Sequence, residues 1–292
     1  MSLITFYLSI ILVNLLDSHV CELPRYPGQE GKGPGIMEYI TAENRVAACG
    51  SFQLSDRSCH ALEPGTSSWK VMPSMGMDHC NNPTRTKSHY SPSLGLGIFG
   101  QRTCDNIKGG LNTEIFSMGI WTSYSTIGYP YTDGFAGATC SVLLNSTTIM
   151  VTGGWKDNIG RLDSSLIVHL ETGTWTSVAK MPAEINQHTC VLTAEGEVLI
   201  AGGAGGSRSV YVYNVADNLW RQEQDLPSQI ETLFSVSLLW NNKPLLLEHN
   251  SDLIWQRTDT GDWQMLNSSM GDTFQGIQNR AILVPGGVFT CP

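Results

Sequence analysis

Charged residues are scarce in this chain of 292 residues: only 15% are Asp, Glu, Lys or Arg, and 26 acidic residues face 17 basic ones. The basic residues form no dense cluster, and the nearest approach is Arg85 and Lys87 beside His89. Binding to nucleic acid or to an anionic membrane needs a concentrated basic surface. We therefore expect neither partner. A hydrophobic content of 41% excludes wholesale disorder and permits a large core.

Helical periodicity and catalytic signatures are also lacking. No apolar pattern of helical period runs beyond 12 residues. No GxSxG, HExxH or paired-carboxylate signature is present. Residues 77–80 gather potential metal ligands, but consecutive residues on a strand or turn rarely converge on one metal. We expect no catalytic residues, no cofactor and no bound metal.

One apolar run is long enough to suggest targeting. Residues 2–16 are uncharged and mostly apolar, and Asp17 ends the run. This length is short for a membrane span but suits the core of a signal peptide. We predict that residues 1–20 are a cleaved secretory signal and that nothing inserts into a membrane after its removal. An uncleaved anchor and a buried N-terminal element are the alternatives.

The eight cysteines all lie beyond that signal. An even number in a secreted chain indicates disulfides, although eight cysteines allow 105 pairings. Triplets typical of N-glycosylation begin at Asn145 and Asn267. We therefore predict a secreted, extracellular, disulfide-bonded glycoprotein. The cysteines are Cys21, Cys49, Cys59, Cys80, Cys104, Cys140, Cys190 and Cys291.

A repeated unit organises the rest of the chain. Residues 140–182 and 190–227 share one order: two apolar strands, Gly-Gly, a polar loop, a third strand, and a Trp on a fourth. The Trp recurs at intervals of 43–54 residues, at positions 69, 121, 175, 220 and 263. Five complete units span about residues 35–269, and a sixth adds strands at 279–285 and 287–291.

Four short strands in a unit of this length favour an all-β fold, a β-propeller, over a β-solenoid. A single sheet of this kind cannot bury both of its faces, so neighbouring sheets must stack on each other. We assign the propeller to residues 36–292, after a segment rich in Pro and Gly at 21–35.

The repeat resembles the kelch repeat, in which a hydrophobic strand ends in Gly-Gly and leads to a strand with Tyr and then to Trp. Other units depart from the pattern, and Glu248-His249 replaces the diglycine of the fifth. The resemblance implies a six-bladed kelch-like propeller with an incomplete last blade, and it implies no activity by itself. The matching residues are Gly153, Gly154, Trp175, Gly202, Gly203, Tyr211, Tyr213, Trp220, Trp263, Gly286 and Gly287.

These motif residues have structural roles. Paired glycines at the end of a strand allow positive φ and close packing between neighbouring blades. The Trp is a large anchor between sheets, and its indole N–H needs a partner.

A propeller also suggests which cysteines pair. Cys49 and Cys59 should lie on adjacent strands of one hairpin, which favours a local bridge. Cys140 and Cys190 begin successive units, and such inner strands can approach bridging distance. Cys80 and Cys104 would then staple the loop of the second unit. A bridge between Cys21 and Cys291, which flank the repeats, would close the ring; the competing account is an open last blade.

Propellers used for binding present their loops on one face, because a rigid scaffold holds variable loops in place. The longest expected loops are 73–90, 103–113, 155–163 and 203–208. We therefore expect a protein-binding module without catalytic activity, whose ligand is a protein or glycoprotein.

Two other functions stay open. One is a propeller enzyme acting on carbohydrate or peptide, with His188, Glu248 and His249 in a central channel, since His beside a carboxylate can perform acid–base chemistry. The other is an intracellular kelch adaptor for ubiquitin ligation or actin. No BTB-like helical domain stands before the repeats to favour the adaptor.

Overall fold

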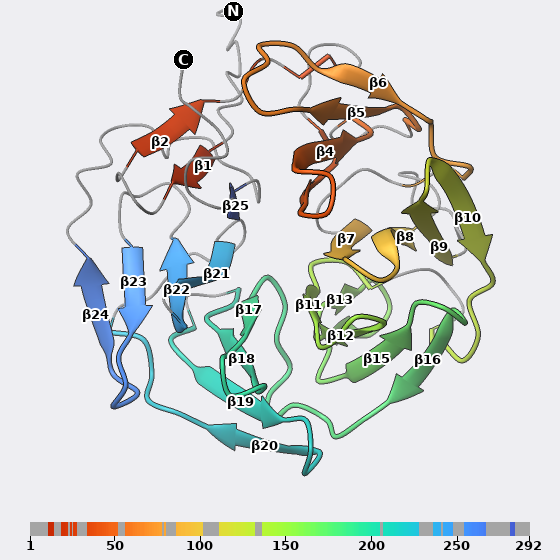
Figure 1. Cartoon of the computed structure of the whole chain (residues 1–292). Coiled ribbons are helices and arrows are strands. Elements are labelled where there is room, and N and C mark those ends of the chain that lie inside the picture. The colour runs from red at the N-terminus through yellow and green to blue at the C-terminus, as the bar shows by residue number, and fades with distance from the viewer. Residues whose placement is uncertain are drawn as a thin grey trace, which may run out of the picture.

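The computed structural model describes residues 11–14, 19–22, 24, 26–27, 34–51, 56–77, 79, 86–101, 111–131, 136–204, 207–227, 236–240, 242–247, 254–266 and 281–283. All regular structure in these ranges is β-strand. Small sheets follow one another around a ring, and β1 (Ile11–Asn14) lies beside β25 (Ala281–Leu283) (Figure 1). The arrangement is an all-β propeller.

Five sheets, blades 1 to 5, have four antiparallel strands each, paired in chain order. The first strand of each lies toward the ring centre and the last lies at the rim (Figure 1). Blade 1 has β3 (Ile36–Ile40), β4 (Arg45–Cys49), β5 (Cys59–Leu62) and β6 (Lys70–Met72); blade 2 has β7 (Thr86–Ser91), β8 (Gly95–Gln101), β9 (Leu111–Ser117) and β10 (Ile120–Tyr124). Blade 3 has β11 (Cys140–Leu143), β12 (Thr148–Thr152), β15 (Ser165–His169) and β16 (Thr174–Ser177). Blade 4 has β17 (Thr189–Leu192), β18 (Val198–Ala201), β19 (Val210–Asn214) and β20 (Leu219–Gln222); blade 5 has β21 (Val236–Trp240), β22 (Lys243–Leu247), β23 (Ile254–Arg257) and β24 (Trp263–Leu266).

The prediction of six blades was wrong, because the described residues form five four-stranded blades. Of the expected sixth unit the described ranges include Ala281–Leu283, which form strand β25, and residues 279–280 and 284–291 lie outside them. β25 pairs in parallel with β1 (Ile11–Asn14), which pairs antiparallel with β2 (His19–Glu22). This three-stranded terminal sheet lies between blade 5 and blade 1 (Figure 1). β1 falls in the segment that we assigned to a signal peptide.

The hydrophobic core is divided among the seams between blades. In β18, Val198 and Ile200 pack toward blade 3, whereas Leu199 and Ala201 pack toward blade 5. Successive side chains on a strand point to opposite faces. A strand that is apolar at every position is therefore buried on both sides, as the stacking of repeated sheets requires.

Tryptophans at the rim fasten blades 1, 2 and 4 to the sheet that precedes each of them. The indole Nε1 of Trp121 donates to the carbonyl of Pro73, just after β6, and that of Trp220 donates to Ala179, just after β16, each at 2.9 Å. Trp69 makes the same contact with Pro24, just after β2, at 2.9 Å. The terminal sheet therefore contacts blade 1 in the way that one blade contacts the next.

The propeller has two unlike faces. Cys140 at the start of β11 pairs with Thr152 at the end of β12, so the loops that enter β11 and leave β12 lie on one side. We name this side the long-loop face. The short turn at residues 144–147 lies on the opposite side, which we name the short-turn face.

Candidate functional site

A small hairpin stands on the long-loop face above blade 3. It consists of β13 (Trp155–Lys156) paired with β14 (Gly160–Arg161). The backbone N–H of Trp155 donates to the carbonyl of Gly137 at 2.7 Å, and the N–H of Gly137 donates back at 3.0 Å. On the other arm, the carbonyl of Leu162 accepts the N–H of Ile185 at 3.0 Å. Both arms of the hairpin are thus tied to neighbouring backbone.

The diglycine of the repeat explains how the chain enters this hairpin. Gly153 and Gly154 have φ values of +56° and +108°, which side chains disfavour. A Cβ added to Gly153 would meet the carbonyl oxygen of Ile185 and would lie 2.8 Å from Cε1 of His188. The close approach to the chain that leads into blade 4 therefore requires glycine.

The hairpin exposes two large apolar side chains. Trp155 is 45% exposed and Ile159 at the turn is 62% exposed, whereas Lys156 between them is buried. The Nζ atom of Lys156 lies 5.9 Å from the centroid of the Tyr131 ring. A part-exposed Trp on a well-held support is typical of the residues that dominate protein interfaces.

Polar residues on the inner strands tie neighbouring blades together. The hydroxyl of Ser88 on β7 donates to Oε1 of Glu38 on β3 at 2.9 Å. Nε2 of His89 on β7 lies 2.9 Å from Oγ of Ser141 on β11. These side chains therefore hold three successive inner strands together.

Burial shifts the ionisation of the inner residues toward their neutral forms. It raises the pKa of Glu38 to about 8, against the smaller opposite effect of Ser88, and it lowers the pKa of Lys87 to about 8. Burial, with a smaller contribution from the charge of Lys87, lowers the pKa of His89 and of His188 to about 3. Both imidazoles are therefore uncharged at neutral pH.

Of the three residues expected to line a catalytic channel, only His188 lies in the described ranges, and its side chain has a buried polar partner. Its Nε2 lies 2.8 Å from Oγ1 of Thr152, and its side chain is buried. A general acid works best with a pKa near the operating pH, which is far above 3. Glu248 and His249 lie outside the described ranges.

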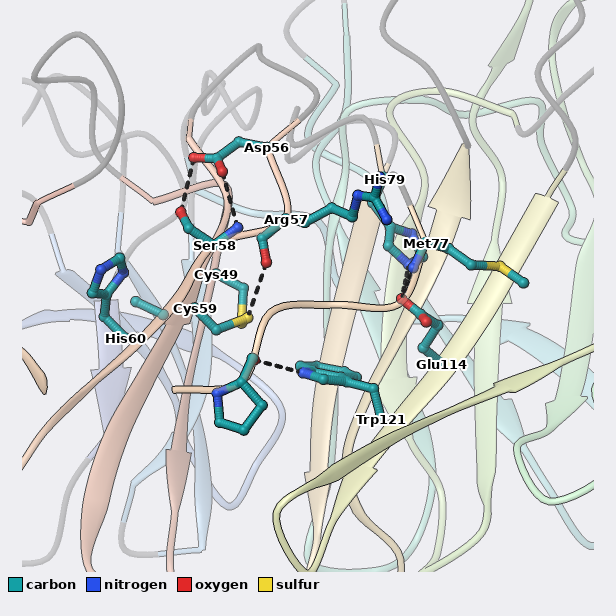
Figure 2. The surroundings of a disulfide bond; sticks show 12 residues. Cys49, Asp56, Arg57, Ser58, Cys59, His60, Met77, His79, Glu114 and Trp121 are labelled. Atoms are coloured by element: carbon teal, nitrogen blue, oxygen red, sulfur yellow. Dashed lines mark hydrogen bonds and ion pairs between the residues drawn. A yellow bond between two sulfur atoms is a disulfide. The ribbon is translucent and has the colours of Figure 1, made fainter. Parts of the chain in front are cut away.

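A second buried cluster, which the sequence did not indicate, lies where blade 1 leads into blade 2 (Figure 2). His79 and Glu114 are both fully buried, and Nε2 of His79 lies 3.1 Å from Oε2 of Glu114. That carboxylate also accepts the N–H of Met77 at 3.1 Å and the hydroxyl of Ser123 at 2.9 Å. Burial alone would raise the pKa of Glu114, but the hydrogen bonds together lower it below its ordinary value.

The partner of His79 is 35 residues away, so no local motif signals the pair. Asp78 and Cys80, its neighbours in the sequence, lie outside the described ranges. Within the part of the chain that the structure describes, no group of three or more His, Cys, Asp or Glu is arranged to hold a metal ion.

Two of the expected disulfides are present. Cys49 and Cys59 pair within blade 1, with Cα atoms 4.1 Å apart (Figure 2). Cys140 and Cys190 join the inner strands of blades 3 and 4, with Cα atoms 5.9 Å apart. The pairings proposed for Cys80, Cys104 and Cys291 lie outside the described ranges, as does the side chain of Cys21.

The other motif residues are placed as follows. Trp175, Tyr211, Tyr213 and Trp263 are buried between blades. Gly202 and Gly203 have φ values of +72° and +134°. Asn145 is exposed in a turn of the short-turn face. Gly286, Gly287 and Asn267 lie outside the described ranges.

The fold defines a β-propeller, and comparison with solved structures agrees. A chain from a structure titled "Structure of YjhT" superposes with a TM-score of 0.63 over 86% of this chain and 88% of that chain, at 12% sequence identity. Likeness at this identity supports the fold and carries no activity with it. No protein-family model matches the sequence. No curated protein matches it either. In the described ranges, no helix has the length and apolar character needed to cross a membrane.

Proposed function

We propose that this chain is a secreted, kelch-like binding module that contacts a protein partner through the long-loop face and performs no catalysis. The observation that carries the proposal is the hairpin of β13 and β14, which presents Trp155 and Ile159 to solvent. Nothing in the propeller core requires these two apolar side chains to be exposed.

The energetics of such a hairpin suit binding. Burial of a Trp and an Ile at an interface gains free energy in proportion to the apolar area removed from water. Association also costs entropy when loops and side chains become ordered. Because backbone hydrogen bonds at Trp155 and Leu162 already hold the hairpin, little of that cost remains.

The position of the glycosylation triplet agrees with binding through the long-loop face. Asn145 is exposed in the turn between β11 and β12, on the short-turn face. A glycan at Asn145 would leave the long-loop face free for a partner. The two disulfides are consistent with an oxidising, extracellular compartment.

The kelch relationship rests on the diglycines and tryptophans. Gly153 and Gly203 both adopt positive φ beside the chain that leads into blade 4, and each would place a Cβ against Ile185 or its carbonyl. Trp220 binds the blade before it through its indole N–H. These are the structural roles that the resemblance implies.

Affinity capture from extracellular fluid tests the proposed surface. The bait is the intact protein in three forms: wild type, Trp155→Ala with Ile159→Ala, and Leu219→Ala with Met265→Ala. The last pair is a matched control, because Leu219 and Met265 are 64% and 51% exposed on the rim strands β20 and β24. We expect one protein to bind the wild type and the control and to be lost with the hairpin variant. Retention by a hairpin variant with an unchanged melting temperature would contradict the proposal.

A further inference from the structure

A groove of about 480 Å³ opens at the seam where blade 2 leads into blade 3. Its walls are residues 123–126, at the end of β10 and just beyond it, together with Met77, Gly128, Tyr129 and Tyr131. The groove adjoins the hairpin, because Lys156 lies over the ring of Tyr131. None of its lining residues belongs to the hairpin or to the inner strands of the blades.

The chemistry of the lining is unusual in this acidic protein, since no charged side chain contributes to it. Three tyrosines and three hydroxyl residues make up most of the wall. A tyrosine offers an apolar ring and a polar tip, and hydroxyls both donate and accept hydrogen bonds. Such a wall matches an uncharged ligand that has apolar C–H faces and hydroxyl groups along its edges. Carbohydrates have this character.

The aromatic part of the wall is held in place before any ligand arrives. The ring of Tyr129 packs edge-on against Trp175, with centroids 4.9 Å apart, and against Tyr131 at 5.5 Å. Its hydroxyl accepts the N–H of Ala136 at 2.9 Å. Gly128 has a φ of +80°, and a Cβ there would lie 2.7 Å from the carbonyl oxygen of Trp175.

The opposite wall is held by the buried carboxylate of Glu114. Its Oε2 accepts the backbone N–H of Met77, and its Oε1 accepts the hydroxyl of Ser123. Met77 and Ser123 both line the groove, although they come from different segments of the chain. Glu114 itself is fully buried, so it is a positioning residue that sets the spacing of two lining residues.

We propose that this groove binds an uncharged saccharide, whose C–H face lies on the tyrosines and whose hydroxyls contact Ser125, Thr126 and the tyrosine tips. The site is separate from the protein-binding hairpin in function, although it shares the long-loop face with it. A free oligosaccharide and the neutral terminus of a glycan on another protein present the same chemistry.

Titration with defined sugars tests the proposal on the intact protein. The probes are cellotriose, maltotriose, N,N′,N″-triacetylchitotriose and lacto-N-tetraose, with 3′-sialyllactose as the charged comparison, and the readout is saturation-transfer NMR with calorimetry. We expect at least one neutral sugar to bind and 3′-sialyllactose to bind no more tightly than that sugar. Absence of binding by every neutral probe at about 10 mM, a concentration that would reveal even millimolar affinity, would overturn the proposal.

Two substitutions locate the binding. Tyr131→Ala removes one aromatic wall, and Ser125→Trp fills the groove from an exposed position. We expect each to weaken the sugar by about tenfold or more. The Trp155→Ala, Ile159→Ala variant should bind the sugar normally, so failure of this site and failure of the hairpin are distinguishable. Sugar binding that survives both groove substitutions would overturn the assignment. If the substitutions weaken it, a test with an N-glycosylated protein separates the two sources of the sugar.

Discussion

Single glycines decide how closely two blades of this propeller approach each other. At Gly153 the backbone is left-handed and the space for a Cβ is occupied by the chain that enters blade 4. Gly160, in the hairpin turn, has a φ of +98°, but no atom lies within 4 Å of the position that a Cβ would take there. The two positions therefore separate backbone strain from steric exclusion.

We expect Gly153→Ala to destabilise the fold more than Gly160→Ala. Strain from positive φ costs about 1–2 kcal/mol at either position, and a collision in a packed seam adds about 1–3 kcal/mol at Gly153 alone. Thermal or denaturant unfolding of the two variants measures the difference. Equal losses of unfolding free energy in the two variants would mean that the contact with the Ile185 carbonyl relaxes without cost.

The ionisation of Glu38 makes the stability depend on pH. Because its folded pKa of about 8 exceeds its ordinary value, the folded protein holds a proton that the unfolded chain has released between about pH 5 and pH 8. The contribution of Glu38 to stability is therefore present below its ordinary pKa and is lost as the pH rises through 8.

The Glu38→Gln variant, which cannot titrate, should gain stability relative to the wild type as the pH rises from 5 to 8. We expect a gain on the order of 1–2 kcal/mol, reduced from the full shift because solvent reaches the half-buried side chain. Urea denaturation at both pH values measures it. Glu171→Gln, at an exposed position in a turn, is the control and should show no such trend. A parallel pH dependence of wild type and Glu38→Gln would contradict the burial of this carboxyl.

At the scale of elements, the two disulfides fasten different levels of the fold. Cys49–Cys59 joins neighbouring strands of one blade across a separation of 10 residues. Cys140–Cys190 joins the inner strands of two blades across a separation of 50 residues. Loop-closure entropy in the unfolded chain grows with the length enclosed.

Removal of the inter-blade bridge should therefore cost more than removal of the local one. The chain-entropy relation gives about 4 kcal/mol for a double Cys→Ser variant at 140 and 190, and about 3 kcal/mol at 49 and 59. Unfolding in guanidinium under non-reducing conditions compares the two variants. A larger loss of stability from removing the Cys49–Cys59 bridge would show that local packing, and not loop closure, determines how much each bridge stabilises the fold.

Much of the element pattern could be predicted from the sequence. The apolar runs ending in Gly153-Gly154 and Gly202-Gly203 became β12 and β18, and the expected third strand of the unit at 190–227 became β19. β12 and β18 are buried at every position, as a strand between two stacked sheets must be. The expected loop at 155–163 contains a hairpin that was not foreseen, because strands of two residues leave no periodic signal.

The candidate sites were harder to predict than the strands. Glu114 lies inside a strand and looks like an alternating polar residue, and only the ring geometry brings His79, Met77 and Ser123 to its carboxylate. The groove at the seam of blades 2 and 3 likewise arises from a connecting loop, whose path the sequence does not specify.

At the scale of the whole molecule, the prediction of six blades failed where the repeat decays. The last unit yields the single described strand β25, which pairs in parallel with β1 from the opposite end of the chain. Trp69 nevertheless binds the carbonyl of Pro24 in the manner of Trp121 and Pro73. The spacing of the repeats thus located five blades but did not show that β1, β2 and β25 would form a separate three-stranded sheet.

Expression in a secreting eukaryotic cell tests the extracellular assignment. We expect secreted protein that lacks about the first 20 residues, carries a glycan on Asn145 and shows no alkylation at the cysteines of the two observed bridges. Peptide mapping after thiol alkylation, with and without deglycosylation, reports all three. Protein that stays inside the cell with its N-terminus intact and its thiols free would favour the intracellular adaptor.

The central claim is that the hairpin above blade 3 contacts a protein partner. Site-specific photo-crosslinking tests it most directly, with p-benzoylphenylalanine placed at Trp155 in one sample and at Leu219 on the rim in another. The account predicts one discrete crosslinked protein from position 155 in extracellular fluid and none from position 219. Crosslinking of a partner from position 219 alone, or the same background from both positions, would contradict it.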